Sequence, residues 1–241
     1  LMLDRGLVMM ADTRTNAGVD NVSTFRKLHT WQRPGDRVVM LMTAGNLGTT
    51  QAVVSLLEER SKAPEEREPA LFAQPSMFRV ARLVSDTLRD VIRRHAAAGQ
   101  KADSAFNATL ILGGQIAGGP PRLFLIYPEG NFIEASADTP FFQIGETKYG
   151  RPILVRAFDP AMSFEAAMKL LLVSFDSTIK ANLSVGAPLD VALYGEGSLA
   201  LDPVRRIGAN DPYFRLISET WGDALKAAFD HLPDMSLDAP D

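Results

Sequence analysis

Residues 6–45 read GLVMMADTRTNAGVDNVSTFRKLHTWQRPGDRVVMLMTAG, and this stretch contains two apolar strands that end in chemically useful residues. The first apolar run ends at Ala11-Asp12-Thr13-Arg14, and the second, residues 38–43, ends at Ala44-Gly45. A shorter predicted strand around residues 25–28 carries Lys27 between them. We therefore expect an acid and a lysine at the ends of neighbouring strands, beside a turn of small residues. These are the parts of a catalytic pocket in which a nucleophile is still missing.

The composition is that of an ordinary globular protein. The chain has 241 residues, of which 46% are hydrophobic and 22% charged, so one large domain can bury a substantial core. A formal net charge of −4 provides no basic surface for nucleic acid, and we expect no such partner. No apolar run approaches the roughly 18 residues that span a bilayer. The first residues show no basic segment followed by a long apolar one, so we expect no secretion signal. We therefore expect no membrane partner.

Cysteine and histidine usage argues against a metal or thiol site. The chain has no cysteine, which excludes disulfides, thiolate metal sites and a cysteine nucleophile within these residues and fits a reducing compartment. His29, His95 and His231 lie far apart, and none has a ligand-type partner at helical or hairpin spacing. We expect no metal site and no cofactor.

The order of the predicted elements indicates the fold class. Turn residues and apolar runs predict two hairpins, then two helices, a meander of strands, further helices, late strands and a final helix. Hairpins and meanders give antiparallel sheets, and the helices come in blocks. We predict an α+β fold: a four-layer αββα sandwich of two antiparallel sheets between helical layers, as a single domain over residues 1–241. Residues 61–75 are expected to be a charged surface connection, and residues 233–241 a loose acidic tail.

The bounds of these predicted elements are as follows. Strands are expected at residues 1–3, 7–11, 27–31, 38–43, 105–116, 122–127, 131–135, 141–144, 189–194 and 204–207. Helices are expected from Asn46 as the N-cap, over 77–95, over 149–158, from Ser163 as the N-cap, and over 213–232.

Several of these segments resemble the proteasome β-subunit family of N-terminal nucleophile hydrolases. GLVMMADTR at residues 6–14 resembles the family's GVVLAADSR, and Arg26-Lys27-Leu28 resembles its lysine strand. AGNLG at residues 44–48 is similar to its oxyanion turn, and LDVA at residues 189–192 to its late IDVAV strand. Within the family, the sequence is most similar to the bacterial branch called Anbu. The segments that carry this similarity are ADTRTNAG, FRKLHTW and LMTAGNLGTTQAV. The resemblance covers almost the whole chain up to the final helix.

The resemblance implies a mechanism built on an N-terminal threonine. Since Leu1 is not an initiator, we expect that residues precede it, with the threonine about five residues upstream. Its hydroxyl would attack a peptide carbonyl while its own α-amine takes the proton. Lys27 would keep the pKa of that amine low, Asp12 would orient Lys27, and Arg14 would steady the loop behind Asp12. The Gly45 N–H would face the oxyanion, and Thr43 would line the pocket for the substrate's first side chain.

Two segments depart from the family pattern. Gly145-Glu146-Thr147 stands where the family has a Gly-Ser-Gly turn, and Asn182 stands where the family has an aspartate. The family's next serine falls on Val185 by strict alignment, or on Ser184 with a shift of one residue. Glu146 is either a substitute acid beside the nucleophile's amine or an ordinary exposed glutamate, and we favour the pocket role.

Each candidate residue also has an ordinary structural interpretation. Asp12 with Arg14 could be a surface ion pair, and Lys27 a strand-edge lysine that discourages aggregation. Taken together with the Ala-Gly turn, in this order, the three favour catalysis. His29 and Trp31, on the lysine strand, are interpreted as packing residues.

The resemblance implies a cytoplasmic threonine peptidase. It would act on peptides or unfolded proteins inside a large homo-oligomeric ring or spiral. The alternatives are a proteasome-fold scaffold with weak or lost catalysis, and an N-terminal nucleophile amidohydrolase that cleaves a small amide.

Overall fold

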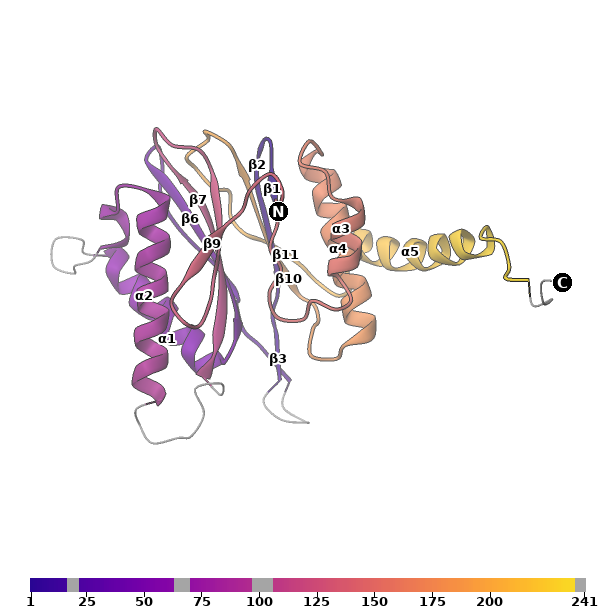
Figure 1. Ribbon diagram of the computed structural model, residues 1–241, viewed down its shortest axis with the longest axis horizontal. Helices are drawn as coiled ribbons and strands as arrows, with labels where there is room; N and C mark the ends of the chain where they lie inside the picture. The colour runs from indigo at the N-terminus through magenta and orange to yellow at the C-terminus, as the bar shows by residue number, and fades with distance from the viewer. Residues whose placement is uncertain (17–21, 63–69, 97–105, 237–241) are drawn as a thin grey trace.

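Two antiparallel sheets lie face to face between two helical layers (Figure 1). This is seen in a computed structural model, which describes residues 1–16, 22–62, 70–96 and 106–236. The layers follow from the sequence pattern, since apolar residues alternate along the strands and recur on one side of each covering helix. The predicted four-layer αββα sandwich is confirmed.

The first sheet has the strand order β1-β2-β10-β11 within the described residues. A tight turn joins β1 (Met2–Leu3) to β2 (Gly6–Asp12), with Leu3 opposite Gly6. The late strand β10 (Leu189–Gly195) then runs antiparallel to β2 along its whole length, and β11 (Arg205–Ile207) follows at the edge. A Cβ on Gly6 would lie 1.9 Å from the Tyr194 carbonyl oxygen, so only glycine lets the two strands approach here.

The second sheet is a meander in chain order. Its strands are β5 (Leu28–Arg33), β6 (Arg37–Gly45), β7 (Ala108–Ile116), β8 (Arg122–Ile126) and β9 (Phe132–Glu134). The turn at residues 33–37 forms as its Pro-Gly sequence predicts. A separate two-stranded ribbon, β3 (Arg14–Asn16) with β4 (Val22–Thr24), carries the chain from the first sheet to the second.

Helices cover the outer face of each sheet (Figure 1). The second sheet packs against α1 (Leu47–Lys62), the 3₁₀ turn η1 (Leu71–Ala73) and α2 (Met77–Ala96). The first sheet packs against α3 (Arg151–Ala157) and α4 (Phe164–Ala181). The last helix, α5 (Pro212–Asp230), starts against α4 and extends away from the body.

The helix starts have the expected caps. Asn46 Oδ1 accepts a hydrogen bond from the Thr49 N–H at 2.9 Å, and Ser163 Oγ accepts one from Ala166 at 3.1 Å. Each side chain satisfies a backbone donor that the first helical turn leaves free.

Side chains of the central strands alternate between two apolar layers. On β2, Leu7 and Met9 face the second sheet, whereas Val8 and Met10 face the α3–α4 layer. On β6 the same alternation divides the buried residues between the sheet interface and the α1–α2 layer. Because both sheets are covered on both faces, their central strands are apolar at almost every position.

The structure corrects four expectations. Residues 141–144 form no strand, although Phe142 and Ile144 pack against the core between the sheets. Residues 61–75 are not a surface connection throughout, because α1 continues to Lys62 and Leu71 is fully buried. Residues 63–69 lie outside the described residues. The strand expected around residues 25–28 does not include Lys27, because residues 25–27 are irregular and β5 begins at Leu28. The ribbon formed by β3 and β4 was not predicted.

Residues 233–236 are irregular and exposed, as expected for the acidic tail, and residues 237–241 lie outside the described part of the chain. Among the helices that the structure describes, none is long and apolar enough to cross a membrane.

A buried hydrogen bond joins the two sheets. Tyr194 on β10 is fully buried and donates its hydroxyl proton to Gln115 Oε1 on β7 at 2.5 Å. The same oxygen accepts the N–H of Gly197 at 2.8 Å. Burial raises the pKa of the Tyr194 phenol, so the hydroxyl stays a donor.

We expect Tyr194→Phe to lower the free energy of unfolding by about 1–2 kcal/mol, because Gln115 loses a buried donor. Urea unfolding followed by circular dichroism measures the change. Tyr213→Phe, at a phenol that is 47% exposed, is the control and should change stability little. Equal effects of the two substitutions would contradict this role of the buried bond.

Candidate active site

The Lys27 ammonium group lies between two acceptors at the open end of the sandwich. It donates to Asp12 Oδ1 at 2.7 Å and to the Arg14 carbonyl oxygen at 2.6 Å. The Lys27 side chain is 23% exposed and that of Asp12 11%, so the ion pair is largely shielded from water. An ammonium group has three protons, and the third is therefore available to a group in the adjoining cavity.

The two sheets bring this pair together. Asp12 is the last residue of β2, and Lys27 directly precedes β5 of the other sheet. Lys27 is held by its backbone as well, since its carbonyl accepts the Thr43 N–H at 3.0 Å. The Phe25 N–H donates to Thr13 O at 2.8 Å and fixes the chain just before the lysine. The expected juxtaposition of acid and lysine is therefore present in the structure.

Asp12 has a second partner that the sequence did not suggest. Its Oδ2 accepts the backbone N–H of Gly186 at 3.3 Å. Arg14 holds the loop in which Gly186 lies, because its Nη1 donates to Leu183 O at 3.0 Å. A Cβ on Gly186 would lie 2.3 Å from Arg14 Cζ, so the guanidinium packs directly on this glycine. The Arg14 contact with the loop behind Asp12 matches the expected position of that side chain.

Gly45 ends β6 with a backbone that favours glycine. Its φ is +110°, and a Cβ there would lie 2.5 Å from the Asn107 carbonyl oxygen. Asn46 follows as the cap of α1, so the turn sits at a helix N-terminus. Gly45 and Lys27 both line the same cavity.

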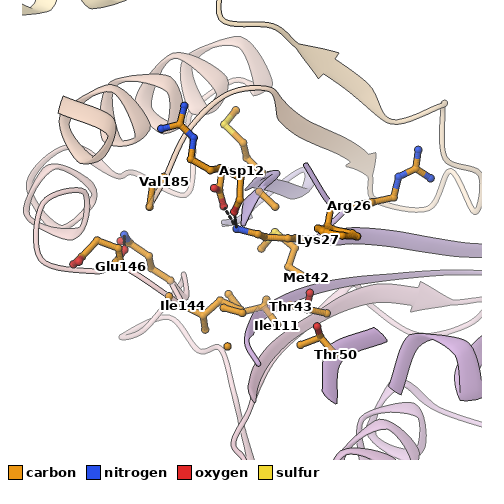
Figure 2. A pocket seen from close by; sticks show the side chains of 18 of the residues that line it. Asp12, Arg26, Lys27, Met42, Thr43, Thr50, Ile111, Ile144, Glu146 and Val185 are labelled. Atoms are coloured by element: carbon orange, nitrogen blue, oxygen red, sulfur yellow. Dashed lines mark hydrogen bonds and ion pairs between the residues drawn. The ribbon is translucent and has the colours of Figure 1, made fainter. Parts of the chain in front are cut away.

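A cavity of about 730 Å³ adjoins these residues (Figure 2). Figure 2 shows Asp12 and Lys27 on one side, Thr43 and Thr50 below them, and Glu146 at the far end. Thr43, 6% exposed, lines the cavity as expected. The apolar part of the wall comes from several elements: Met42, Ile111, Phe142, Ile144 and Val185. The sequence did not indicate Ile111, Phe142 or Ile144 as part of it.

Glu146, Asn182 and Ser184 form one hydrogen-bonded chain beside this cavity. Asn182 Nδ2 donates to Glu146 Oε2 at 2.8 Å, and Ser184 donates both its N–H and its hydroxyl to Asn182 Oδ1, at 2.9 and 2.7 Å. Glu146 and Ser184 line the cavity. The Lys148 backbone N–H, and then the Asn182 amide, hold the pKa of Glu146 below its usual value.

His29 lies in the cavity wall and also packs against a neighbouring ring. Its imidazole stacks on Trp31 with centroids 6.3 Å apart, which agrees with the expected packing role. Burial and then the charge of Arg26 lower the pKa of His29. Within the described ranges, no three side chains of the metal-binding types are grouped so that they could hold a metal ion.

The proteasome subunit family model matches residues 1–193 of the chain. The chain belongs to the proteasome subunit family. The match covers the β2 end, the lysine strand and the Ala-Gly turn, and it confirms the resemblance seen in the sequence.

Solved structures of Anbu proteins are similar over nearly the full length. Anbu (ancestral beta-subunit) from Yersinia bercovieri is 47% identical with a TM-score of 0.91, covering 98% of both chains. Anbu from Hyphomicrobium sp. strain MC1 is 49% identical with a TM-score of 0.87, covering 98% of this chain and 97% of that one.

A third similar structure is described as a helical assembly of the Anbu complex from Pseudomonas aeruginosa. It is 44% identical with a TM-score of 0.90, covering 98% of this chain and 97% of that one. The expected similarity to the Anbu branch is thus confirmed. Comparison with curated proteins gave no match.

We expect Asn182→Asp to raise the pKa of Glu146, because a hydrogen-bond donor is replaced by a like charge. Asn182→Ala should raise it less, since only the donor is lost and the Lys148 N–H remains. Carboxyl-selective ¹³C NMR titration measures both shifts.

The lowered pKa of Glu146 also makes the free energy of unfolding depend on pH. With its folded pKa lowered, Glu146 contributes stability above its unfolded pKa, and this is lost as pH falls through the folded value. An unchanged Glu146 titration in Asn182→Asp would show that the two side chains do not interact in solution.

Proposed function

We propose that this protein is a threonine-type peptidase subunit of a proteasome-like homo-oligomer. The observation that carries the proposal is the Lys27 ammonium, fixed by Asp12 and the Arg14 carbonyl at the edge of a large cavity. The nucleophile is a threonine expected about five residues before Leu1, as the family resemblance implies. Its substrates are peptides or unfolded proteins.

The register of β1 supports this position for the nucleophile. Leu1 and Val8 are paired across the two antiparallel strands, since they exchange backbone hydrogen bonds of 2.8 and 3.0 Å. If this pairing continues, each residue further upstream of Leu1 lies opposite the residue one position further along β2. Five such steps from Val8 reach Thr13, next to Asp12. Leu1, Val8, Met10 and Asp12 all line the cavity, so this path leads to Lys27.

The proposed chemistry needs only the threonine, its own amine and these tuning groups. The hydroxyl oxygen bonds to the peptide carbonyl carbon while the α-amine takes its proton and later gives it to the leaving amine. Water then hydrolyses the acyl-enzyme. The positive charge of Lys27 keeps the α-amine unprotonated by disfavouring a second cation, and Asp12 holds Lys27 in place. Arg14 positions Asp12 through the Gly186 loop.

Gly45 and Thr43 complete the site on the β6 side. A backbone N–H at the Gly45 turn would stabilise the developing oxyanion, an effect worth about 2.7–4 kcal/mol for a single donor. Thr43 would contact the first side chain of the substrate. Glu146, linked to Asn182 and Ser184, would supply a second anion at the far end of the cavity.

The assembly is proposed to be a large cytoplasmic ring or spiral with the sites facing inward. The Pseudomonas aeruginosa structure, described as a helical assembly of the Anbu complex, supports a self-assembling subunit. Enclosing the sites would restrict substrates to extended chains.

We expect Lys27→Ala to reduce kcat/KM on a fluorogenic peptide by about 10²–10⁴-fold, because the α-amine loses the charge that keeps it a base. Lys169→Ala, at an exposed lysine that does not line the cavity, is the control and should leave the rate unchanged. Sedimentation and circular dichroism check that both variants assemble and fold.

A peptide vinyl sulfone tests the nucleophile directly. Mass spectrometry should find the adduct on an N-terminal threonine of the native protein and none on the Lys27→Ala variant. No adduct under conditions that label a proteasome would contradict the peptidase. A Lys27→Ala variant that assembles and keeps its cellular function would indicate the scaffold instead, and cleavage of small amides but not of peptides would indicate the amidohydrolase.

A further inference from the structure

The last helix is packed over its first half only. Phe214 and Ile217 are 7% and 8% exposed and pack in the α3–α4 layer, and Trp221 lies partly buried beside them. From Asp223 onward every described residue is exposed. Figure 1 shows this part of α5 pointing away from the body. We call residues 223–232 the α5 tip.

The apolar stripe of α5 does not stop where the packing stops. Phe214, Ile217 and Trp221 are followed at helical spacing by Leu225, Phe229 and Leu232. These last three side chains are 50%, 75% and 66% exposed. A helical end without tertiary contacts is marginal in water, and an exposed contiguous apolar stripe marks an interaction surface. The tip therefore needs a partner.

The charge around the stripe is negative. Asp223 lies 4.0 Å from Lys226, whereas Asp230 and the nearby Asp234 form no ion pair with any described residue. A partner surface should be apolar at its centre and basic around it.

The short helix α3 presents such a surface on the same chain. Val155 is 62% exposed and Tyr149 41% exposed. Lys148, Arg151 and Arg156 surround Val155 in a hollow of about 420 Å³, together with Thr147 and Pro152. In the part of the chain that the structure describes, Arg151 and Arg156 form no ion pair with a carboxylate, whereas the charge of Lys148 helps to lower the pKa of the nearby Glu146. We call residues 147–156 the α3 face.

We propose that the α5 tip of one subunit docks on the α3 face of a second copy of this chain. The tip cannot reach its own α3 face, because α5 leaves the helical layer and points away from it (Figure 1). A second copy fits better than an unrelated protein, since the acidic apolar tip and the basic apolar hollow complement each other and occur on one chain. The helical assembly of the similar Pseudomonas aeruginosa protein agrees with a contact between copies.

Docking of two different surfaces has a consequence for assembly. Each copy provides one tip and accepts another, so the contact can repeat from subunit to subunit and generate a ring or an open spiral. This inference rests on the self-assembly in the proposed function and is independent of peptidase activity.

The first experiment compares the size of the full-length protein and its variants by analytical ultracentrifugation. Leu225→Ser with Phe229→Ser removes the apolar tip, and Arg151→Glu with Arg156→Glu reverses the charge of the hollow. Each pair should weaken the contact at least tenfold and yield smaller species. Phe78→Ser and Arg79→Glu with Arg93→Glu, at exposed positions on α2, are the matched controls and should assemble like the parent.

The second experiment mixes the two defective proteins. The tip variant still has an intact α3 face, and the hollow variant still has an intact tip, so one productive contact forms between them. Mixing should produce a larger species that neither protein forms alone.

The outcomes separate this inference from the proposed function. Tip and hollow variants that assemble like the parent would overturn the docking contact while leaving peptidase and assembly intact. A mixture that gives no new species would overturn it too. A parent protein that is monomeric would overturn the docking contact and the assembly together, whereas Lys27-dependent peptide cleavage would still be measurable on its own.

Discussion

The ion pair between Lys27 and Asp12 is the constraint on which the site depends, because it joins the two sheets at their open end. Asp12 ends β2 of the first sheet, and Lys27 stands directly before β5 of the second. A carboxylate this deeply buried is stable only with a partner, and removing one member of such a pair leaves the other uncompensated. The spacing between the sheets and the position of the ammonium are therefore set by the same contact.

The side of the site away from this pair is organised by the end of α4 and the loop that follows it. Asn182, directly after the last helical turn, bridges Glu146 and Ser184, and Gly186 in the same loop reaches Asp12. Arg14 connects the loop to the strand end from which Asp12 comes. Residues far apart in sequence thus form one polar framework around the cavity, while its remaining wall is apolar.

The elements with strong hydrophobic periodicity could be predicted from the sequence. Features that depend on contacts between distant residues were predicted less accurately. The hairpins, the meander and the capped helices follow from alternation, turn residues and cap residues, all of which act over a few positions. Leu71 was assigned to the surface because the segment around it is rich in charged residues and proline. A single buried leucine in such a segment gives no periodic signal. Residues 141–144 have a strand-like composition, but no neighbouring strand pairs with them. The pairing of Asp12 with Lys27 was expected, whereas its contact with Gly186 involves only a backbone N–H and leaves no side-chain signal.

That backbone contact limits how position 186 can evolve. A main-chain donor survives nearly every amino-acid exchange, so selection at this codon does not act on the hydrogen bond itself; only proline would remove it. Selection acts instead on volume, because a Cβ there would lie 2.3 Å from Arg14 Cζ and the guanidinium would have to move off the loop. The two neighbouring positions differ in this respect. Leu183 contributes a backbone carbonyl to Arg14 while its side chain is 83% exposed, so an exchange there needs only to keep the loop on its course. Val185 lines the cavity, so an exchange there changes the wall of the site.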